Sequence, residues 1–189
     1  MKKEKIGSRV RKGFFLCSSL FVFRYSAVLF LTVAPCAAGA QTCKDSIPAS
    51  TPESRFTAHN NGTVTHKTTG LTWMRCSLGQ IWDGKTCTGK AEIFDWQKIL
   101  QAAGSQEFAD HKDWRLPSKN ELVSILEERC VAPAVNAKIF PGTPSAYFWS
   151  SSPYSGVADG AWSVDFGYGS INASVKSGGL YVRLVRGGR

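Results

Sequence analysis

The chain is poor in the residues that build catalytic and metal sites. It has three histidines and two methionines among 189 residues, and His59, His66 and His111 are too scattered to form a metal-ligand motif. No Gly-x-Ser-x-Gly sequence is present, which excludes the nucleophile elbow of the α/β-hydrolases. No Cys-x-x-Cys pair is present either, so a four-cysteine zinc site has the wrong spacing. We expect no catalytic residue, metal or cofactor, and we expect the histidines to be exposed turn residues.

Long apolar runs are missing after residue 40, so we expect no membrane span there. Most of the basic surplus also lies before that point. Residues 1–40 hold seven of the 23 Lys and Arg residues but one of the 14 acids, which leaves 16 basic and 13 acidic residues, a net charge of +3, in the later chain. A nucleic-acid-binding protein shows a clustered basic stripe, so we exclude nucleic acid as a partner.

The first 40 residues have the three parts of a signal peptide. A basic stretch over residues 1–12 precedes an apolar run over residues 14–33, and small residues follow at 37–40. We predict cleavage after Ala40 and a secreted, periplasmic or cell-surface protein of bacterial type. An uncleaved anchor is the alternative, which Arg24 opposes because a central arginine costs about 2.5–3.5 kcal/mol in a spanning helix.

Four of the six cysteines lie after the signal peptide. An even number in an exported chain indicates disulfides. Three pairings are open, and we favour Cys76–Cys87 and Cys43–Cys130. The first closes a short loop rich in turn residues, and the second attaches the N-terminal segment to the end of a predicted helix.

One domain of the α+β class is predicted over residues 55–189, after a flexible tail at 41–54 that is rich in Ser, Thr and Pro. Asn61-Gly62 marks a hairpin turn, with a strand at 71–75. Helices are expected at 92–103 and from Ser118 to about Cys130, the second with Ser118 and Glu121 as a capping box. Alternating apolar residues predict strands at 147–150, 161–166 and 180–185.

Five motifs together resemble the Lcl C-terminal domain family, named after a domain of a collagen-like bacterial adhesin. They are Asn61–Thr65, Thr69–Met74, Asp113–Pro117 with Glu121-Leu122, Phe148–Ser152 and Val182–Arg186. The resemblance implies a disulfide-stapled, C-type-lectin-like fold of antiparallel sheets and two helices, akin to formylglycine-generating enzymes. It also implies an extracytoplasmic, adhesin-like module that binds a glycan, sulfated in the adhesin, or a surface protein. Members also resemble variable ligand-binding targets of diversity-generating retroelements.

The last third of the chain carries the candidate ligand residues, because aromatic rings with nearby polar groups suit recognition on loops. They are Tyr147, Tyr154, Trp162, Asp165, Tyr168, Asn172 and Lys176, with Trp162 weighed as a core residue as well. Trp114, Arg115, Leu116 and Pro117 are interpreted as structural, with Arg115 satisfying backbone carbonyls. The rival hypothesis is an enzyme of the formylglycine-generating type or a glycan hydrolase, which needs a free thiol or a carboxylate pair.

Overall fold

The computed structural model describes residues 40–188, so the predicted signal peptide lies outside the described residues except for Ala40. Most regular elements of this part are short strands, joined by turns and two short α-helices. Among these residues no helix has the length and apolar character needed to cross a bilayer. The α+β class and the antiparallel sheets predicted from the sequence are confirmed.

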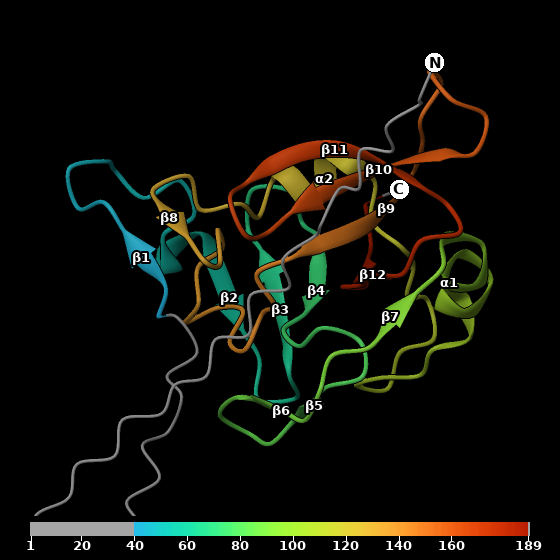
Figure 1. Cartoon of the computed structure of the whole chain (residues 1–189). Helices are drawn as coiled ribbons and strands as arrows, with labels where there is room; N and C mark the ends of the chain where they lie inside the picture. The colour runs from blue at the N-terminus through green and yellow to red at the C-terminus, as the bar shows by residue number, and fades with distance from the viewer. Residues whose placement is uncertain (1–39, 189) are drawn as a thin grey trace, which may run out of the picture. The chain divides into compact units, whose positions relative to one another are not determined.

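A five-stranded sheet takes four of its strands from residues 147–181 and the fifth from an earlier segment (Figure 1). Its order is β11 (Ser170–Val175), β10 (Gly160–Asp165), β9 (Tyr147–Pro153), β12 (Leu180–Tyr181) and β7 (Ile93–Phe94). All pairs are antiparallel except β12 with β9. A bulge interrupts β9, because Ser163 pairs with Trp149 while Ala161 pairs with Pro153. The strands predicted at 147–150 and 161–166 are therefore present as β9 and β10. The strand predicted at 180–185 does not form as one element, because only Leu180–Tyr181 pair in this sheet and Val185–Arg186 belong to the second sheet. Strand β11 was not predicted.

A second, four-stranded sheet has the order β13 (Val185–Arg186), β4 (Thr72–Met74), β3 (Thr63–His66) and β2 (Phe56–Ala58). The predicted Asn-Gly turn joins β2 to β3. Asn61 accepts a hydrogen bond from the Thr63 N–H, and Gly62 has φ of 82°. A Cβ at Gly62 would lie 2.7 Å from Cγ of Trp82, so glycine is needed for both conformation and space.

Helix α1 spans Trp96–Ala102 and continues as the 3₁₀ turn η2 (Ala103–Ser105). The predicted start at residue 92 is wrong, since Ile93 belongs to β7 and its side chain is 59% exposed. Pairing of β7 with β12 outweighs the local helical pattern there. Asp95 caps the helix by accepting a hydrogen bond from the Lys98 N–H. The buried residue of α1 is Ile99, whereas Leu100, expected on the apolar face, is exposed.

Helix α2 spans Lys119–Val123 and begins with the predicted capping box of Ser118 and Glu121. The predicted continuation to Cys130 is wrong. Val123 is the last helical residue, and Cys130 lies in β8 (Cys130–Val131). Strand pairing between β8 and β1 (Thr42–Cys43) and the disulfide there hold this segment in an extended conformation.

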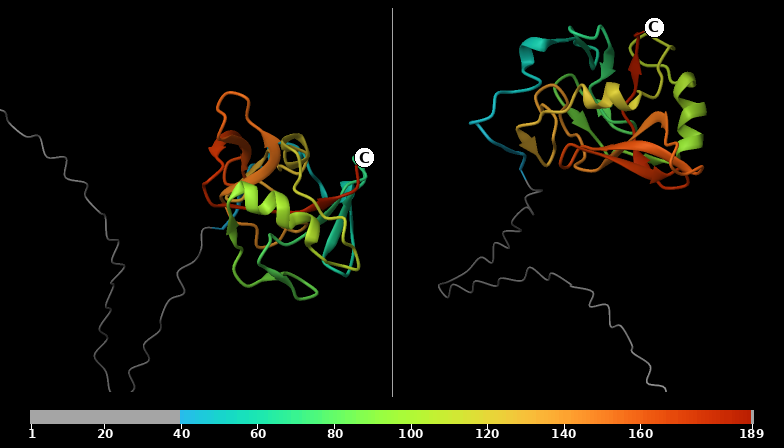
Figure 2. Two further views of the ribbon diagram at one scale, coloured as in Figure 1. Left: turned by 90° about the vertical axis from the view of Figure 1, so that its right-hand side faces the viewer. Right: turned by 90° about the horizontal axis from the view of Figure 1, so that it is seen from above.

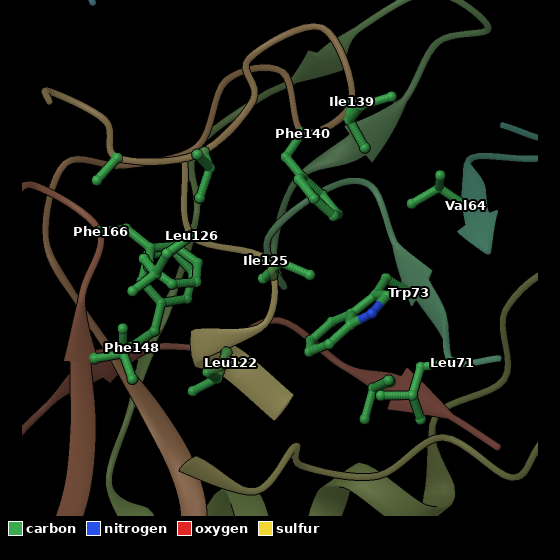
Figure 3. Packing of buried hydrophobic residues seen from close by; sticks show 14 of the residues in the cluster. Val64, Leu71, Trp73, Leu122, Ile125, Leu126, Ile139, Phe140, Phe148 and Phe166 are labelled. Carbon is green, nitrogen blue, oxygen red and sulfur yellow. The ribbon is translucent and has the colours of Figure 1, made fainter. Parts of the chain in front are cut away.

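Two buried clusters fill the domain. The first lies between α2 and both sheets, and Figure 3 shows Leu122 and Ile125 between Phe148 and Phe166 on one side and Trp73 on the other. The second includes Ile99, Trp114, Trp149 and Leu184. We call the side of the five-stranded sheet that carries Phe148 the α2 face, and the side that carries Trp149 the α1 face.

Both predicted disulfides are present, Cys43–Cys130 and Cys76–Cys87. The second encloses the short hairpin of β5 (Ile81–Trp82) and β6 (Cys87–Thr88). All four cysteines that follow the predicted signal peptide are therefore used as cross-links.

The segment 41–54 differs from its prediction as a flexible tail. The Glu127 carboxylate accepts hydrogen bonds from the N–H groups of Ser50 and Thr51, both at 3.0 Å, and from the Thr51 hydroxyl at 2.9 Å. The 3₁₀ turn η1 (Glu53–Arg55) follows. Burial acts to raise the pKa of Glu127, but these hydrogen bonds outweigh it and lower the pKa. The buried Glu127 carboxylate therefore holds this segment against the domain. Ordered structure begins before Arg55, the position at which the sequence predicted it to start.

Candidate functional site

The Trp114–Pro117 motif builds the scaffold on which the candidate site rests. Arg115 donates to both carboxylate oxygens of Glu121 at 2.8 and 2.7 Å, and to the carbonyl of Gly187 at 2.8 Å. The hydrogen bonds from Arg115, and then those from Ser118, hold the pKa of Glu121 below its usual range despite partial burial. Arg115 therefore joins the start of α2 to the segment after β13. Its main partner is the Glu121 carboxylate, in addition to a backbone carbonyl of the kind expected from the sequence.

The serine run after Trp149 connects this scaffold to the five-stranded sheet. The Ser151 N–H donates to the carbonyl of Pro117 at 2.7 Å, and the Lys119 N–H donates to the Ser152 hydroxyl at 3.0 Å. Within the bulge, the Ser150 hydroxyl donates to the carbonyl of Trp162 at 2.7 Å. The N-terminus of α2 is thus fixed against β9 and β10, and it carries Lys119 to the sheet.

The predicted ligand residues do not form one group, because the sheet separates them into two ends. Tyr154, Trp162 and Lys176 lie at the end where β9 turns into β10. Tyr147 pairs with Asp165 at the opposite end, where the exposed Tyr168 sits in the β10–β11 turn. Asn172 lies between the two ends, on β11. Asp165 is buried and accepts a hydrogen bond from the Gly167 N–H at 2.7 Å, so its carboxylate holds the turn.

An open pocket of about 500 Å³ lies at the first of these ends. The start of α1, the loop between β9 and β10, and the turn after β11 meet there (Figure 2). We call it the loop pocket. All of its lining residues have polar or charged side chains, whose aliphatic parts also form part of the wall. They are Asp95, Gln97, Lys98, Gln101, Asp159, Lys176 and Ser177.

Lys176 holds the wall of the loop pocket in place. Its ammonium donates to the carbonyl of Ala158 at 2.9 Å and lies 4.9 Å from the centroid of the Trp96 ring. The Trp96 indole N–H donates to the carbonyl of Ser150 at 2.7 Å, and its backbone N–H donates to the carbonyl of Lys176. These contacts tie the β9–β10 loop to α1, so the pocket walls are pre-organised.

The α2 face of the same loop carries an aromatic pair. Tyr154 meets Trp162 edge-on, with ring centroids 4.8 Å apart, and the Lys119 ammonium lies 4.6 Å from the Trp162 ring. Trp162 is partly buried, so it is neither a full core residue nor a freely exposed ligand residue, the two roles considered for it from the sequence. Tyr154 also packs under the loop, since a Cβ on Gly156 would lie 2.5 Å from the Tyr154 ring. This pair shapes the loop from the side away from the loop pocket.

The loop pocket has balanced charge. Asp95 forms an ion pair with Lys98 at 2.7 Å, and hydrogen bonds from the Lys98 side chain and then its backbone N–H lower the pKa of Asp95. Asp159 and Lys176 add one charge of each sign. The pocket thus offers hydrogen-bond donors and acceptors with no net charge, an arrangement suited to hydroxyl-rich ligands.

Sequence reasoning found Lys176 but missed the α1 side of the loop pocket. Gln97 and Gln101 stand four residues apart on an exposed helix face, a spacing that the sequence shows. Nothing local indicates that this face lies opposite Asp159, because the two segments meet only in the folded chain. A polar helix face is usually read as a solvated surface.

The histidines do not meet. His59 contacts the Thr65 hydroxyl at 3.0 Å, while His66 is buried against Phe56. The expectation that His66 is exposed is therefore wrong, because β3 turns its side chain into the core. Within residues 40–188 no group of three or more His, Cys, Asp or Glu side chains could hold a metal ion.

Comparison with known proteins agrees with the motifs described above. The sequence model of the Lcl C-terminal domain matches residues 62–186, from β3 to β13. This range includes the five-stranded sheet, three of the four strands of the second sheet and the loop pocket. No curated protein matches the chain. The matched range covers well over half of the chain and confirms the resemblance predicted from the sequence. The chain therefore belongs to the Lcl C-terminal domain family.

Proposed function

We propose that this protein is an exported, non-catalytic, adhesin-like module that binds a glycan in the loop pocket. The observation that carries the proposal is the lining of that pocket. Two carboxylates, two amides, two ammonium groups and a hydroxyl surround about 500 Å³ of open space. Sugars present many hydroxyls that both donate and accept, so a lining with both kinds of group complements them.

Charge balance favours a neutral glycan over a sulfated one. Each ammonium of the loop pocket has a carboxylate among its lining residues, and Lys176 is already bound to the carbonyl of Ala158. A sulfate group would have to compete with Asp95 for Lys98 and with the Ala158 carbonyl for Lys176. Binding of a neutral glycan should depend weakly on salt, since salt screens interactions between charges and the ligand carries none.

Export and a C-type-lectin-like fold are part of the proposal. Two disulfides support an oxidising compartment, where such cross-links form and persist. They also support a binding role over a formylglycine-generating enzyme, because the cysteines of residues 40–188 are all paired and present no thiolate nucleophile. Family membership supports the adhesin-like role.

The test is an array of neutral, sialylated and sulfated glycans, followed by titration of each ligand found. The combined change Gln97→Ala and Gln101→Ala removes both amides from an exposed helix face. Lys85→Ala, an exposed lysine on the β5–β6 hairpin, is the matched control. Loss of two hydrogen bonds to the ligand should weaken binding roughly tenfold or more, with the control unchanged.

Three results would overturn the proposal. Binding that survives the glutamine changes would place the ligand elsewhere. A ligand set limited to sulfated glycans, with steep loss of affinity in salt, would contradict the argument from charge balance. Cleavage of a bound glycan, detected by mass spectrometry after prolonged incubation, would restore the enzyme hypothesis.

A further inference from the structure

Strand β11 is an open edge of the five-stranded sheet (Figure 1). It is six residues long, Ser170–Val175, and contains no charged residue and no proline. Its apolar side chains lie on the α2 face but are exposed, Ile171 by 45% and Val175 by 58%. Such an edge presents unpaired backbone groups and is a template for pairing with another chain.

The other edges of the two larger sheets are protected in the usual ways. β7 is two residues long and lies between Glu92 and Asp95. β13 has two residues, one of them Arg186, and β2 has three residues and follows Arg55. Short length and flanking charge are the common devices against strand addition. β11 is longer and has no charge within the strand, and the Lys176 ammonium that follows it is turned back onto Ala158 of its own chain, so β11 is the least protected of these edges.

The backbone of β11 shows which groups face outward. The Lys176 N–H donates to the carbonyl of Asp159, and the Asn172 carbonyl accepts from the Ser163 hydroxyl, so the even-numbered residues face β10. Because N–H and C=O groups alternate between the two edges of a strand, those of Ile171, Ala173 and Val175 point to the open edge. Their side chains share the α2 face.

We propose that β11 pairs antiparallel with β11 of a second copy of this chain, about a two-fold axis at Ala173. In this register Ala173 faces its own counterpart and Ile171 faces Val175 of the second copy. The outward N–H and C=O groups of Ala173 then pair with those of its counterpart, and Ile171 exchanges hydrogen bonds with Val175 of the second copy. The Val175 carbonyl also accepts a hydrogen bond from the Gly178 N–H of its own chain at 2.8 Å, so it is shared between the two donors. The apolar side chains meet apolar side chains. A shift by one residue would place Ile171 opposite the polar Ser174, which would lose both the hydrogen-bond pairing and the apolar side-chain contacts.

Charge permits this symmetric pairing. The strand itself is uncharged, so the two-fold axis brings no like charges together. Lys176 ends the strand, and in the proposed register the two Lys176 residues are six positions apart, or roughly 20 Å. That distance exceeds the screening length of about 8 Å at physiological salt. Each ammonium is also turned back onto Ala158 and Trp96 of its own chain.

The pairing has a functional consequence. Only this consequence, and not the pairing itself, rests on the proposed glycan binding. A two-fold axis at Ala173 runs perpendicular to the joined sheets, so both α1 faces lie on the same side. The two loop pockets would then open on one side of the dimer, at opposite ends of the joined strands. Two weak sites displayed together on one rigid sheet bind a surface by avidity.

Sedimentation velocity of the purified protein over a range of concentrations tests the pairing. We expect concentration-dependent dimers. Ala173→Pro removes an outward N–H that β10 does not use and should weaken self-association roughly tenfold or more. Ala173→Lys should act similarly by setting two ammonium groups face to face. Ile81→Lys, at a side chain that is 70% exposed on the β5–β6 hairpin, is the matched control and should leave the dimer intact.

A cross-linking pair tests the register without relying on loss of binding. In a hydrogen-bonded antiparallel pair the Cα atoms are about 5.5 Å apart, which a disulfide spans. Ala173→Cys should therefore form a covalent dimer under mild oxidation, while Ile171→Cys, roughly 13 Å from its counterpart, should not. A monomer at all concentrations, a dimer that tolerates both Ala173 changes, or equal cross-linking at the two positions would overturn the proposal. Glycan binding by a monomer would leave the proposed function standing.

Discussion

Arg183 is a fully buried arginine that has no carboxylate partner among its hydrogen bonds. Its guanidinium donates to the carbonyls of Met74 and Arg75 and to the hydroxyls of Thr143, at 2.6 Å, and Ser77, at 3.4 Å. It also lies 4.7 Å from the Phe140 ring. Burial lowers the pKa of Arg183 to about 9, so the group is still charged at neutral pH.

The change Arg183→Met tests how far this network stabilises the domain. Methionine fills similar space but leaves the two carbonyls without their donor. An unsatisfied buried acceptor costs about 1–3 kcal/mol, while removing the buried charge returns part of that cost. Thr143 keeps a partner, because its hydroxyl also donates to the carbonyl of Phe140. We expect a net loss of about 2–4 kcal/mol, a large share of the roughly 5–15 kcal/mol that stabilises a typical domain.

Urea unfolding with the disulfides intact, followed by tryptophan fluorescence, measures this loss as a lower midpoint at unchanged slope. Arg186→Met is the control, since Arg186 makes an ion pair with the half-exposed Asp113 and should cost less than about 1 kcal/mol. A loss below about 1 kcal/mol for Arg183→Met, equal to the control, would refute the reasoning. It would mean that the cost of burying the charge cancels its hydrogen bonds.

Three further changes probe stability at separate positions. Burial, and then the charge of Arg55, lower the pKa of His66 from its ordinary value of 6.5, so the unfolded chain binds the proton more readily than the folded one. The free energy of unfolding, measured by urea titration, should therefore fall as pH drops below about 6.5. The control His111→Gln should keep this fall, and His66→Phe should lose it. Gly62→Ala should cost about 2 kcal/mol or more through its positive φ and the Trp82 ring, whereas Gly70→Ala, with φ of 70° and nothing within 4 Å, should cost about 1 kcal/mol; equal thermal shifts would exclude the steric part. Replacing Cys43 and Cys130 by serine should cost about 4.6 kcal/mol and replacing Cys76 and Cys87 about 2.8 kcal/mol, because their sequence separations are 87 and 11 residues; the reverse order in calorimetry would contradict the chain-entropy account.

Local signals predicted the elements that local chemistry controls. The Asn61-Gly62 turn, the Ser118–Glu121 capping box and the strands β9 and β10 form where the sequence placed them. Each depends on groups within a few residues of one another, so the pattern alone identifies it. The even cysteine count predicted two disulfides, and the pairing favoured among the three open ones is the pairing found.

Long-range pairing decided where local patterns ended. Ile93 fits a helical face in the sequence but pairs with Tyr181 in β7. The helix predicted to reach Cys130 stops at Val123, because the chain must turn back to meet Cys43. Residues 41–54 have the composition of a tail, yet Glu127 fastens them by hydrogen bonds. In each case the deciding partner lies far away in the sequence.

The sequence by itself determined the family, the α+β class, the cross-links and the turn and cap positions. Tertiary structure alone decided the site. The loop pocket joins Gln97 on α1, Asp159 on the β9–β10 loop and Lys176 after β11, and the sheet separates Tyr154 from Tyr168 although both sit in similar loop sequence. It also decided that β11 is an edge. Hydrogen bonds and packing between distant segments set these placements, and no local pattern of residues encodes which distant segments will meet.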